Sequence, residues 1–276
     1  MYKKFLLLVA ILFFISFIFF TTGDRSKWLQ PKINPVKHSV MSFDFKDNAL
    51  TYAKALPRYS HFPLLTPSYE TSLEISSLQA SENIFNNICA PLNQKHLLIA
   101  LYDIGMADSF FILSPFNVPP LSPGRAIKIY GFKRLFNCQN SFFYYSSHQP
   151  DSSNVGILNI CPAQKDDFLT AVVYKVNQED FLHLRQAYPG YNLVPVVAQE
   201  YNQPTHPFFI CYTWEADPLY INDSILPSRH AYSLIWQLLD SPEYIKKYGL
   251  PFSKDYLNTT FLADGHSVME IHEEYK

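Results

Sequence analysis

Carboxylates are the side chains in this sequence that could carry out acid/base chemistry. Asp103 stands near the end of the apolar run HLLIALYDI, so a predicted buried strand would present it at a loop. A carboxylate in such a position can carry a proton between two reacting atoms. Five further acidic residues are candidate bases, although such residues commonly lie solvated on the surface. They are Asp108, Glu200, Glu215, Asp217 and Asp223.

The sequence lacks the other common catalytic signatures. It contains no HExxH, GxSxG or Walker motif, and His266 and His272 are too widely spaced to form a metal pair on one helical face. No metal and no cofactor is therefore expected. Four cysteines occur outside any CxxC pair: Cys89, Cys138, Cys161 and Cys211. They are expected either to form disulfides in an oxidising compartment or to be small buried thiols.

The composition is that of a folded domain without a strong electrostatic field. Apolar residues make up 48% of the 276 residues, and aromatic residues 16%, which is enough for one sizeable core. Lys and Arg together number 22, against 24 for Asp and Glu. Because this balance gives no attraction toward polyphosphate, nucleic acid is not an expected partner.

Residues 1–23 are predicted to be a transmembrane anchor or a signal peptide. The uncharged run from Phe5 to Gly23 would measure about 28 Å as a helix, close to the thickness of a bilayer core. Thr21 and Gly23 are small enough for a cleavage site, so both alternatives stay open. A short basic N-terminus tends to remain inside. The domain is therefore expected outside the cytoplasm, either membrane-anchored or secreted.

Residues 24–94 are predicted to form a Pro-containing linker with short helices. Five prolines and the lack of periodicity up to residue 67 predict a tether. The stretch SYETSLEISSLQASENIFNNICA, residues 68–90, predicts one or two short amphipathic helices, the second of them beginning at Ser81.

Residues 95–265 have the pattern of one α+β domain, and residues 266–276 are expected to be a tail. Asn177 is expected to cap a short helix, QEDFLHLRQAY, and residues 228–250 predict an amphipathic helix. This order predicts a mixed, partly closed β-sheet or barrel with flanking helices. The predicted strands cover residues 96–104, 124–137, 141–147, 155–162, 168–176, 191–201 and 207–216.

The order of these segments resembles the γ-glutamylcyclotransferase-like family. Each motif is a short and unspecific apolar string, but all six occur in the family's order, and the match as a whole covers about residues 95–260. The motifs are YGFKRLF at Tyr130–Phe136, NICP at Asn159–Pro162, LTAVVYKV at Leu169–Val176, EDFLHLR at Glu179–Arg185, YNLVPV at Tyr191–Val196 and PSRHAY at Pro227–Tyr232. The resemblance implies the fold of that family.

The resemblance also implies a chemistry, which this sequence does not support. Members of the family cyclise a γ-glutamyl group and release 5-oxoproline, with a Glu that carries the proton from the attacking to the leaving amine. Such a residue contributes about 10² to 10⁴ in rate. The position of that Glu falls on Gln186 or on Tyr188, depending on the alignment. Neither residue is acidic, so the standard activity is expected to be lost.

The substrate loop departs from the family as well. Tyr102 keeps the Tyr of the family's YGSN loop, whose backbone N–H groups bind the α-carboxylate of the substrate, and Asp103 stands at the Gly position. A second anion about 6 Å away would cost about 3 kcal/mol at an effective dielectric constant of about 20. The residues expected to line the ligand site are Tyr102, Asp103, Ile104, Gly105, Tyr191 and Tyr232.

Three functions fit these features. The first is a membrane-tethered or exported pseudoenzyme that binds a γ-glutamyl-like small molecule or a protein partner. The second is a divergent cyclotransferase or acyl-transfer enzyme with a relocated acid/base residue, in which Asp103 pairs with an amine of the substrate. The third is an interaction protein with an aromatic-rich exterior.

Overall fold

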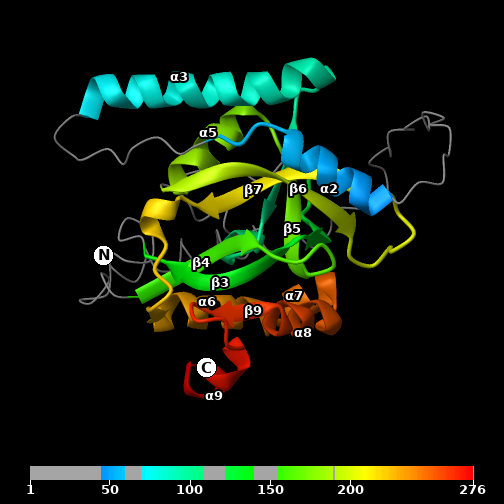
Figure 1. Cartoon of the computed structure of the whole chain (residues 1–276), viewed down its shortest axis with the longest axis vertical. Helices are drawn as coiled ribbons and strands as arrows, with labels where there is room; N and C mark the ends of the chain where they lie inside the picture. Colours follow the sequence, from blue (N-terminus) through cyan, green and yellow to red (C-terminus); the bar gives the residue numbers. More distant parts are fainter. Residues whose placement is uncertain (1–44, 60–69, 108–121, 140–154, 189, 276) are drawn as a thin grey trace, which may run out of the picture. The chain divides into compact units, whose positions relative to one another are not determined.

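The strands in the described part of the chain form a closed five-stranded barrel and a separate four-stranded sheet (Figure 1). The computed structural model describes residues 45–59, 70–107, 122–139, 155–188 and 190–275. In order around the barrel, the strands are β1 (Leu97–Leu101), β5 (Phe168–Val176), β2 (Arg125–Tyr130), β6 (Tyr191–Glu200) and β7 (Phe209–Ala216). Neighbours are antiparallel, except that β7 closes the barrel on β1 in parallel. The expected α+β class with a mixed, closed sheet is confirmed.

The second sheet begins where the sequence predicted one uninterrupted strand. The strand predicted over residues 124–137 is wrong, because β2 ends at Tyr130 and β3 begins at Phe132 in the other sheet. Gly131 between them has φ 77°, a conformation that residues with a side chain rarely adopt. The sheet has the order β8 (Leu226–Pro227), β4 (Val155–Pro162), β3 (Phe132–Cys138) and β9 (Thr260–Leu262).

The helices pack around these two sheets. The described α-helices are α2 (Phe45–Ala55), α3 (Glu70–Cys89), α5 (Gln178–Ala187), α6 (Arg229–Leu239), α7 (Pro242–Tyr248), α8 (Leu250–Asn258) and α9 (His272–Tyr275). The described short 3-10 helices are η3 (Ala90–Leu92), η4 (Ile104–Met106), η7 (Pro218–Tyr220) and η8 (Val268–Glu270). In Figure 1, α3 runs over α5, and α6, α7 and α8 lie beside β9.

Helix capping explains where several of these helices begin and end. The predicted cap at Asn177 is confirmed, since its side chain accepts a hydrogen bond from the N–H of Asp180 at 2.8 Å. A single helix over residues 228–250 is wrong, because Ser241 caps a new helix and Gly249, at φ 90°, starts a third. A helix beginning at Ser81 is also wrong, since Ser81 is buried inside α3.

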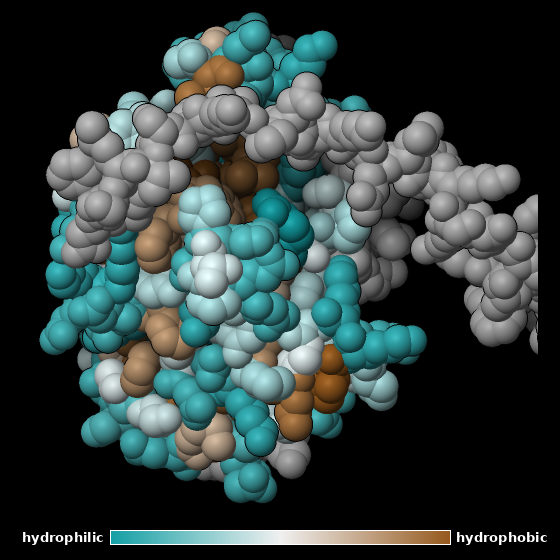
Figure 2. Space-filling model, turned by 90° about the vertical axis from the view of Figure 1, so that its right-hand side faces the viewer, coloured by the Kyte–Doolittle hydropathy of each residue, from teal (hydrophilic) through white to brown (hydrophobic). Residues whose placement is uncertain are grey.

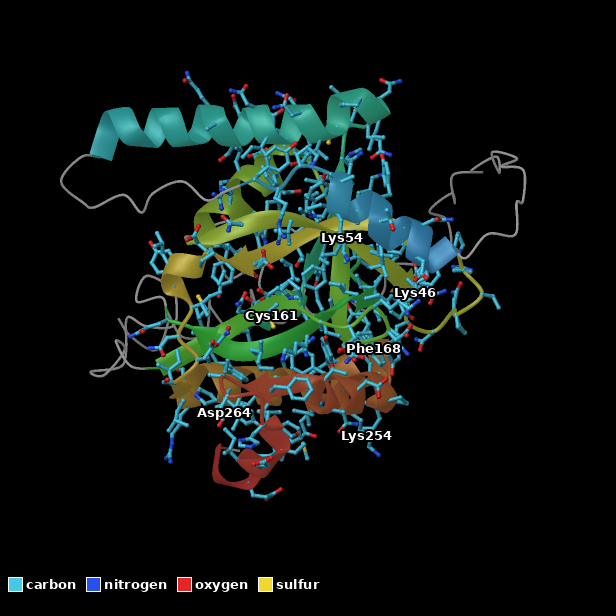
Figure 3. The ribbon with its side chains drawn as sticks, in the orientation of Figure 1. Lys46, Lys54, Cys161, Phe168, Lys254 and Asp264 are labelled. Carbon is cyan, nitrogen blue, oxygen red and sulfur yellow. The ribbon has the colours of Figure 1, made fainter. Side chains whose placement is uncertain are left out.

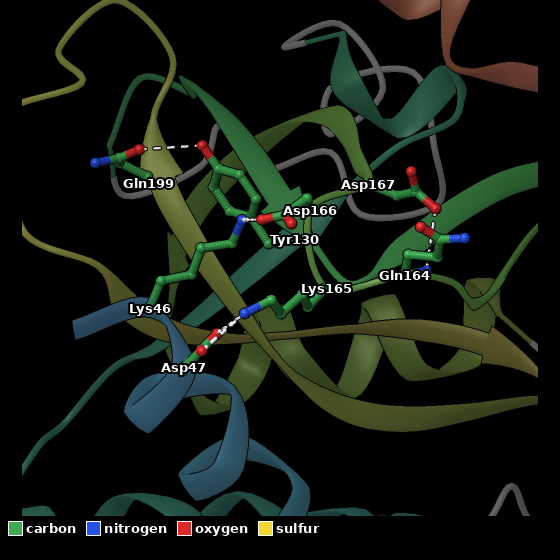
Figure 4. A network of polar contacts seen from close by, with 8 residues as sticks. All are labelled: Lys46, Asp47, Tyr130, Gln164, Lys165, Asp166, Asp167 and Gln199. Carbon is green, nitrogen blue, oxygen red and sulfur yellow. Dashed lines mark hydrogen bonds and ion pairs between the residues drawn. The ribbon is translucent and has the colours of Figure 1, made fainter. Parts of the chain in front are cut away.

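Part of the predicted tether is a helix that packs on the barrel. Ala53 of α2 is buried, and two ion pairs join the start of α2 to the turn between β4 and β5 (Figure 4). Nζ of Lys46 lies 2.6 Å from Oδ1 of Asp166, and Nζ of Lys165 lies 2.9 Å from Oδ2 of Asp47. Residues 45–59 therefore belong to the domain.

Several predictions fall on residues outside the described ranges. The N-terminal apolar run, the strand predicted over residues 141–147 and Asp108 all lie there. Within the ranges that the structure describes, no helix is long and apolar enough to cross a bilayer. The anchor or signal peptide thus stays a prediction.

The surface mixes polar and apolar side chains. The face shown in Figure 2 is mainly hydrophilic, with apolar residues interspersed. In Figure 3, Lys46 and Lys54 lie on α2, whereas Lys254 and Asp264 lie among the C-terminal elements, and Cys161 lies between these groups on β4. All four cysteines are free thiols, and three of them are buried, in agreement with the second of the two alternatives for them.

Candidate functional site

The candidate site lies at one end of the barrel, where four elements meet. Since β1 and β7 are parallel and β6 is antiparallel to β7, the ends of β1 and β7 lie at the same rim as the start of β6. Asp103 follows β1, Trp214 lies near the end of β7, and Tyr191 begins β6. Tyr188, the C-cap of α5, reaches the same place just before β6.

The loop after β1 folds around the side chain of Asp103. Its Oδ1 atom accepts a hydrogen bond from the N–H of Gly105 at 2.8 Å and so caps η4. Asp103 is only 6% exposed. A Cβ atom at position 105 would lie 2.7 Å from the hydroxyl of Tyr188, so this close approach requires glycine.

Tyr188 binds directly to this carboxylate. Its hydroxyl donates a hydrogen bond to the same Oδ1 atom of Asp103 at 2.8 Å. The ring of Tyr188, which is 2% exposed, stacks on Trp214 with centroids 5.2 Å apart and meets Tyr191 edge-on at 5.8 Å. Asp103, in the expected substrate loop, is therefore in contact with Tyr188, which is one of the two alternative positions of the family's Glu.

Burial shifts the pKa of the Asp103 carboxyl. Desolvation raises the pKa of the Asp103 carboxyl above its ordinary value, while the hydrogen bonds from Tyr188 and Gly105 and the more distant charge of Arg134 act in the opposite direction. A carboxyl with a raised pKa holds and releases a proton closer to neutral pH. A raised pKa is a property that acid/base residues share, so Asp103 stays a candidate for that role.

Arg134 is a buried cation that the sequence analysis did not single out. It extends from β3, and its Nη1 atom donates to Oγ1 of Thr260 at 2.8 Å and to the carbonyl oxygen of Tyr256 at 3.2 Å. A further bond joins it to the carbonyl oxygen of Thr170, and its guanidinium lies 3.5 Å from the ring centroid of Tyr256. The hydroxyl of Tyr256 donates to the carbonyl oxygen of Tyr102 at 2.8 Å, so Arg134 supports the loop indirectly.

The other predicted tyrosines use their hydroxyls within the fold. Tyr102 donates to the carbonyl oxygen of Trp214 at 2.7 Å, and Tyr191 donates to that of Leu158 at 2.6 Å. The hydroxyl of Tyr232 lies 2.5 Å from Nδ1 of His272 in α9. Tyr102 and Tyr191 thus join the cluster around Tyr188, whereas Tyr232 contacts His272 of α9 and Phe136 of β3.

The two remaining predicted site residues add little to this geometry. Ile104 is half-buried in η4, beside the core. Gln186 lies in the last turn of α5, and its side chain is outside the described part of the structure.

The other acidic candidates in the described ranges are bonded elsewhere. Glu215 is the most buried of them; desolvation raises its pKa, and the guanidinium of Arg58 opposes that rise. No group of three or more His, Cys, Asp and Glu side chains in the described ranges could hold a metal ion. The bonds of the acidic candidates are Glu200 to Arg125, Glu215 to Arg58, Asp217 to the N–H of Leu219 and Asp223 to Asn137.

Known structures with some similarity to this chain include a γ-glutamyl cyclotransferase. No protein-family model and no curated protein sequence matches the chain. Among solved structures, YkqA from Bacillus subtilis has 11% identity and a TM-score of 0.40, with 59% of this chain and 56% of that chain covered. The glutathione-specific γ-glutamyl cyclotransferase from yeast has 14% identity and a TM-score of 0.37, with 65% and 99% covered.

A third similar structure is that of an Arabidopsis thaliana protein, with 12% identity, a TM-score of 0.34 and coverage of 55% of this chain and 88% of that chain. The chain thus spans just over half the length of YkqA. The yeast protein belongs to the class that the sequence motifs resemble. The fold described above rests on the strand pairing of this chain itself.

Proposed function

We propose that this chain is a γ-glutamylcyclotransferase-like binding module that does not catalyse the standard cyclisation. One observation carries the proposal: Oδ1 of Asp103 accepts hydrogen bonds from both Tyr188 and the N–H of Gly105. In the family, the N–H groups of this loop bind the carboxylate of the substrate, and the acid/base Glu stands at the position of Gln186 or of Tyr188, depending on the alignment. Here an internal carboxylate takes the place of the substrate anion.

The energetic consequence is large enough to abolish the standard reaction. A substrate carboxylate about 6 Å from Asp103 would lose about 3 kcal/mol at an effective dielectric constant of about 20, which is about a hundredfold in affinity. The missing Glu would remove a further 10² to 10⁴ or so in rate. These two losses act on separate steps, binding and proton transfer, so they multiply.

The test is 5-oxoproline release from glutathione, γ-glutamyl amino acids and γ-glutamyl amines by the purified chain. No release above background is expected, and appreciable turnover by the unaltered chain would refute the proposal. The double variant Asp103→Gly with Tyr188→Glu removes the carboxylate from the loop and places a Glu at position 188. It is expected to gain activity. Its matched control is Asp103→Gly with Tyr188→Gln, which lacks the acid, and Gln186→Glu tests the other alignment.

A second function is favoured by the raised pKa of Asp103 and its bond to Tyr188. These features fit a divergent transferase or cyclase in which Asp103 carries the proton and pairs with a substrate amine. If such an activity is found, Asp103→Asn is expected to abolish it, whereas Tyr248→Phe, a hydroxyl deletion on α7, is expected to leave it intact. Full activity of Asp103→Asn would remove this alternative.

We also propose that the domain acts outside the cytoplasm, anchored or exported by residues 1–23. The length and uncharged character of the run from Phe5 to Gly23 support this. Fractionation of cells that express the chain tests it. Recovery of the intact chain in the cytoplasmic soluble fraction would contradict both the anchored and the exported form.

A further inference from the structure

The site contains a buried carboxyl group within aromatic rings. Asp103 and the rings of Tyr188, Tyr191 and Trp214 are all buried. Oδ1 of this carboxylate accepts hydrogen bonds from two neutral donors, the hydroxyl of Tyr188 and the backbone N–H of Gly105. None of the ion pairs between described residues includes Asp103. A cation would therefore complement this carboxylate better than its present donors do.

Trp214 supplies a second, independent sign of a missing ligand. Its Nε1 atom is buried and has no hydrogen-bond partner among the described residues. A buried N–H donor without a partner is rare in proteins and unfavourable. One face of the indole stacks on Tyr188, and the ring of Phe181 is also nearly parallel to it, at 6.3 Å. The indole thus has both an unused donor and a face covered by Tyr188.

Among the rings of Tyr188, Tyr191 and Trp214, that of Tyr188 belongs to a residue outside the strands. Trp214 and Tyr191 lie in β7 and β6, whose backbones are fixed by barrel hydrogen bonds. Tyr188 ends α5 with φ −116° and ψ 58°, and Gly190, at φ 77°, follows shortly after. Its side chain can therefore leave the cluster without breaking the barrel, at the expense of its contacts, among them the hydrogen bond to Asp103 and the ring contacts with Trp214 and Tyr191.

We propose that this site binds an organic cation, either a primary amine or a quaternary ammonium group. The cation binds in the place that the Tyr188 ring fills, and it displaces that ring. In this arrangement the cation lies on the face of Trp214 and next to the carboxylate of Asp103. Aromatic faces and a carboxylate are the groups that recognise such cations in proteins. An acceptor oxygen on the same ligand would pair with the free Nε1–H. This inference rests on the proposed binding function.

Matched probes on the unaltered chain test the charge requirement first. The probes are phenethylamine, tetramethylammonium, the neutral isostere 2-phenylethanol and the anion 3-phenylpropionate, each titrated by calorimetry. The two cations are expected to bind, and phenethylamine is expected to bind about tenfold or more tightly than 2-phenylethanol, because only the cation pairs with Asp103. The displaced Tyr188 ring is expected to change the tryptophan fluorescence.

Variants then assign the site. Asp103→Asn is expected to weaken phenethylamine binding about tenfold or more. Its control is Asp180→Asn, which changes a carboxylate of equal exposure, 6%, in the first turn of α5 and is expected to leave binding unchanged. Tyr188→Phe is expected to tighten binding a few-fold, because the hydrogen bond from the ring to Asp103 is missing and the cation displaces the ring more easily.

The outcomes separate this inference from the function on which it rests. Absence of cation binding, equal binding of phenethylamine and 2-phenylethanol, or undiminished binding by Asp103→Asn would each overturn the inference. Preferential binding of 3-phenylpropionate would overturn it too, while leaving a binding module without cyclotransferase activity. Release of 5-oxoproline by the unaltered chain would instead overturn the proposed function.

Discussion

Replacing Tyr188 by Phe is expected to destabilise the domain in a pH-dependent way. The substitution keeps the ring that stacks on Trp214 and removes only the hydroxyl that donates to Oδ1 of Asp103 at 2.8 Å. When Asp103 is ionised, this is a hydrogen bond to a charged group, whose loss costs about 1.5 to 3 kcal/mol of unfolding free energy. When Asp103 is protonated, the bond is neutral and its loss costs about 0.5 to 1.5 kcal/mol.

The direction of the pH dependence follows from the pKa of Asp103. Burial raises this pKa above the ordinary value of 3.8. Ionisation of Asp103 therefore lowers the stability of the folded chain as pH rises through the window between the ordinary pKa and the raised pKa. The hydroxyl of Tyr188 lowers the pKa of Asp103, and its removal therefore extends the window upward. The cost of Tyr188→Phe should be smallest below the raised pKa of the unaltered chain and largest above the still higher pKa of the variant.

Urea unfolding at pH 4 and pH 8 measures this difference. The control is Tyr191→Phe, which removes a buried hydroxyl bonded at 2.6 Å to the neutral carbonyl of Leu158, and its cost is expected to be the same at both pH values. A cost of Tyr188→Phe that is equal at pH 4 and pH 8, or that follows the control, would refute an ionised Asp103 in the folded chain.

Two further substitutions test the parts of the fold that hold this site. Arg134→Met is expected to cost about 2 to 5 kcal/mol in urea unfolding, because it removes the buried guanidinium that donates to the carbonyl oxygen of Thr170 and to Oγ1 of Thr260; a loss below 1 kcal/mol or so would contradict this. Gly131→Ala is expected to cost about 1 to 2 kcal/mol, since φ at this junction of the two sheets is 77°, and an unchanged unfolding midpoint would show that the junction tolerates a side chain.

The sequence predicted best those elements whose burial is uniform and whose ends carry local signals. The run FLTAVVYKV became β5 with the same bounds, because a strand buried along almost its whole length shows a continuous apolar sequence. The helix after it was predicted from Asn177, whose capping bond depends only on residues three positions apart. The proximity of Tyr102, Asp103 and Tyr191 was expected from the resemblance.

The sequence failed where structure depends on contacts between distant residues. The alternation from β2 into β3 continues through Gly131 and hides the change of sheet, although a glycine inside an alternating run is a signal of a bend. The packing of α2 depends on ion pairs such as that of Lys46 with Asp166, 120 positions away. The sequence did contain a signal for a special role of Arg134. It shares a strand face with Phe132 and Phe136, so it places a charge on an apolar face.

Asp103 and Tyr188 depend on each other energetically. A Glu in place of Tyr188 alone would bring two carboxylates together in a buried place, and one of them would have to take up a proton. A Gly in place of Asp103 alone would leave the Tyr188 hydroxyl and the N–H of Gly105 buried without an acceptor, at about 1 to 3 kcal/mol each. Each residue is therefore favourable only in the presence of the other, although 85 positions separate them. Because each single exchange carries such a penalty, the double variant Asp103→Gly with Tyr188→Glu is expected to be less destabilised than the sum of its two single variants.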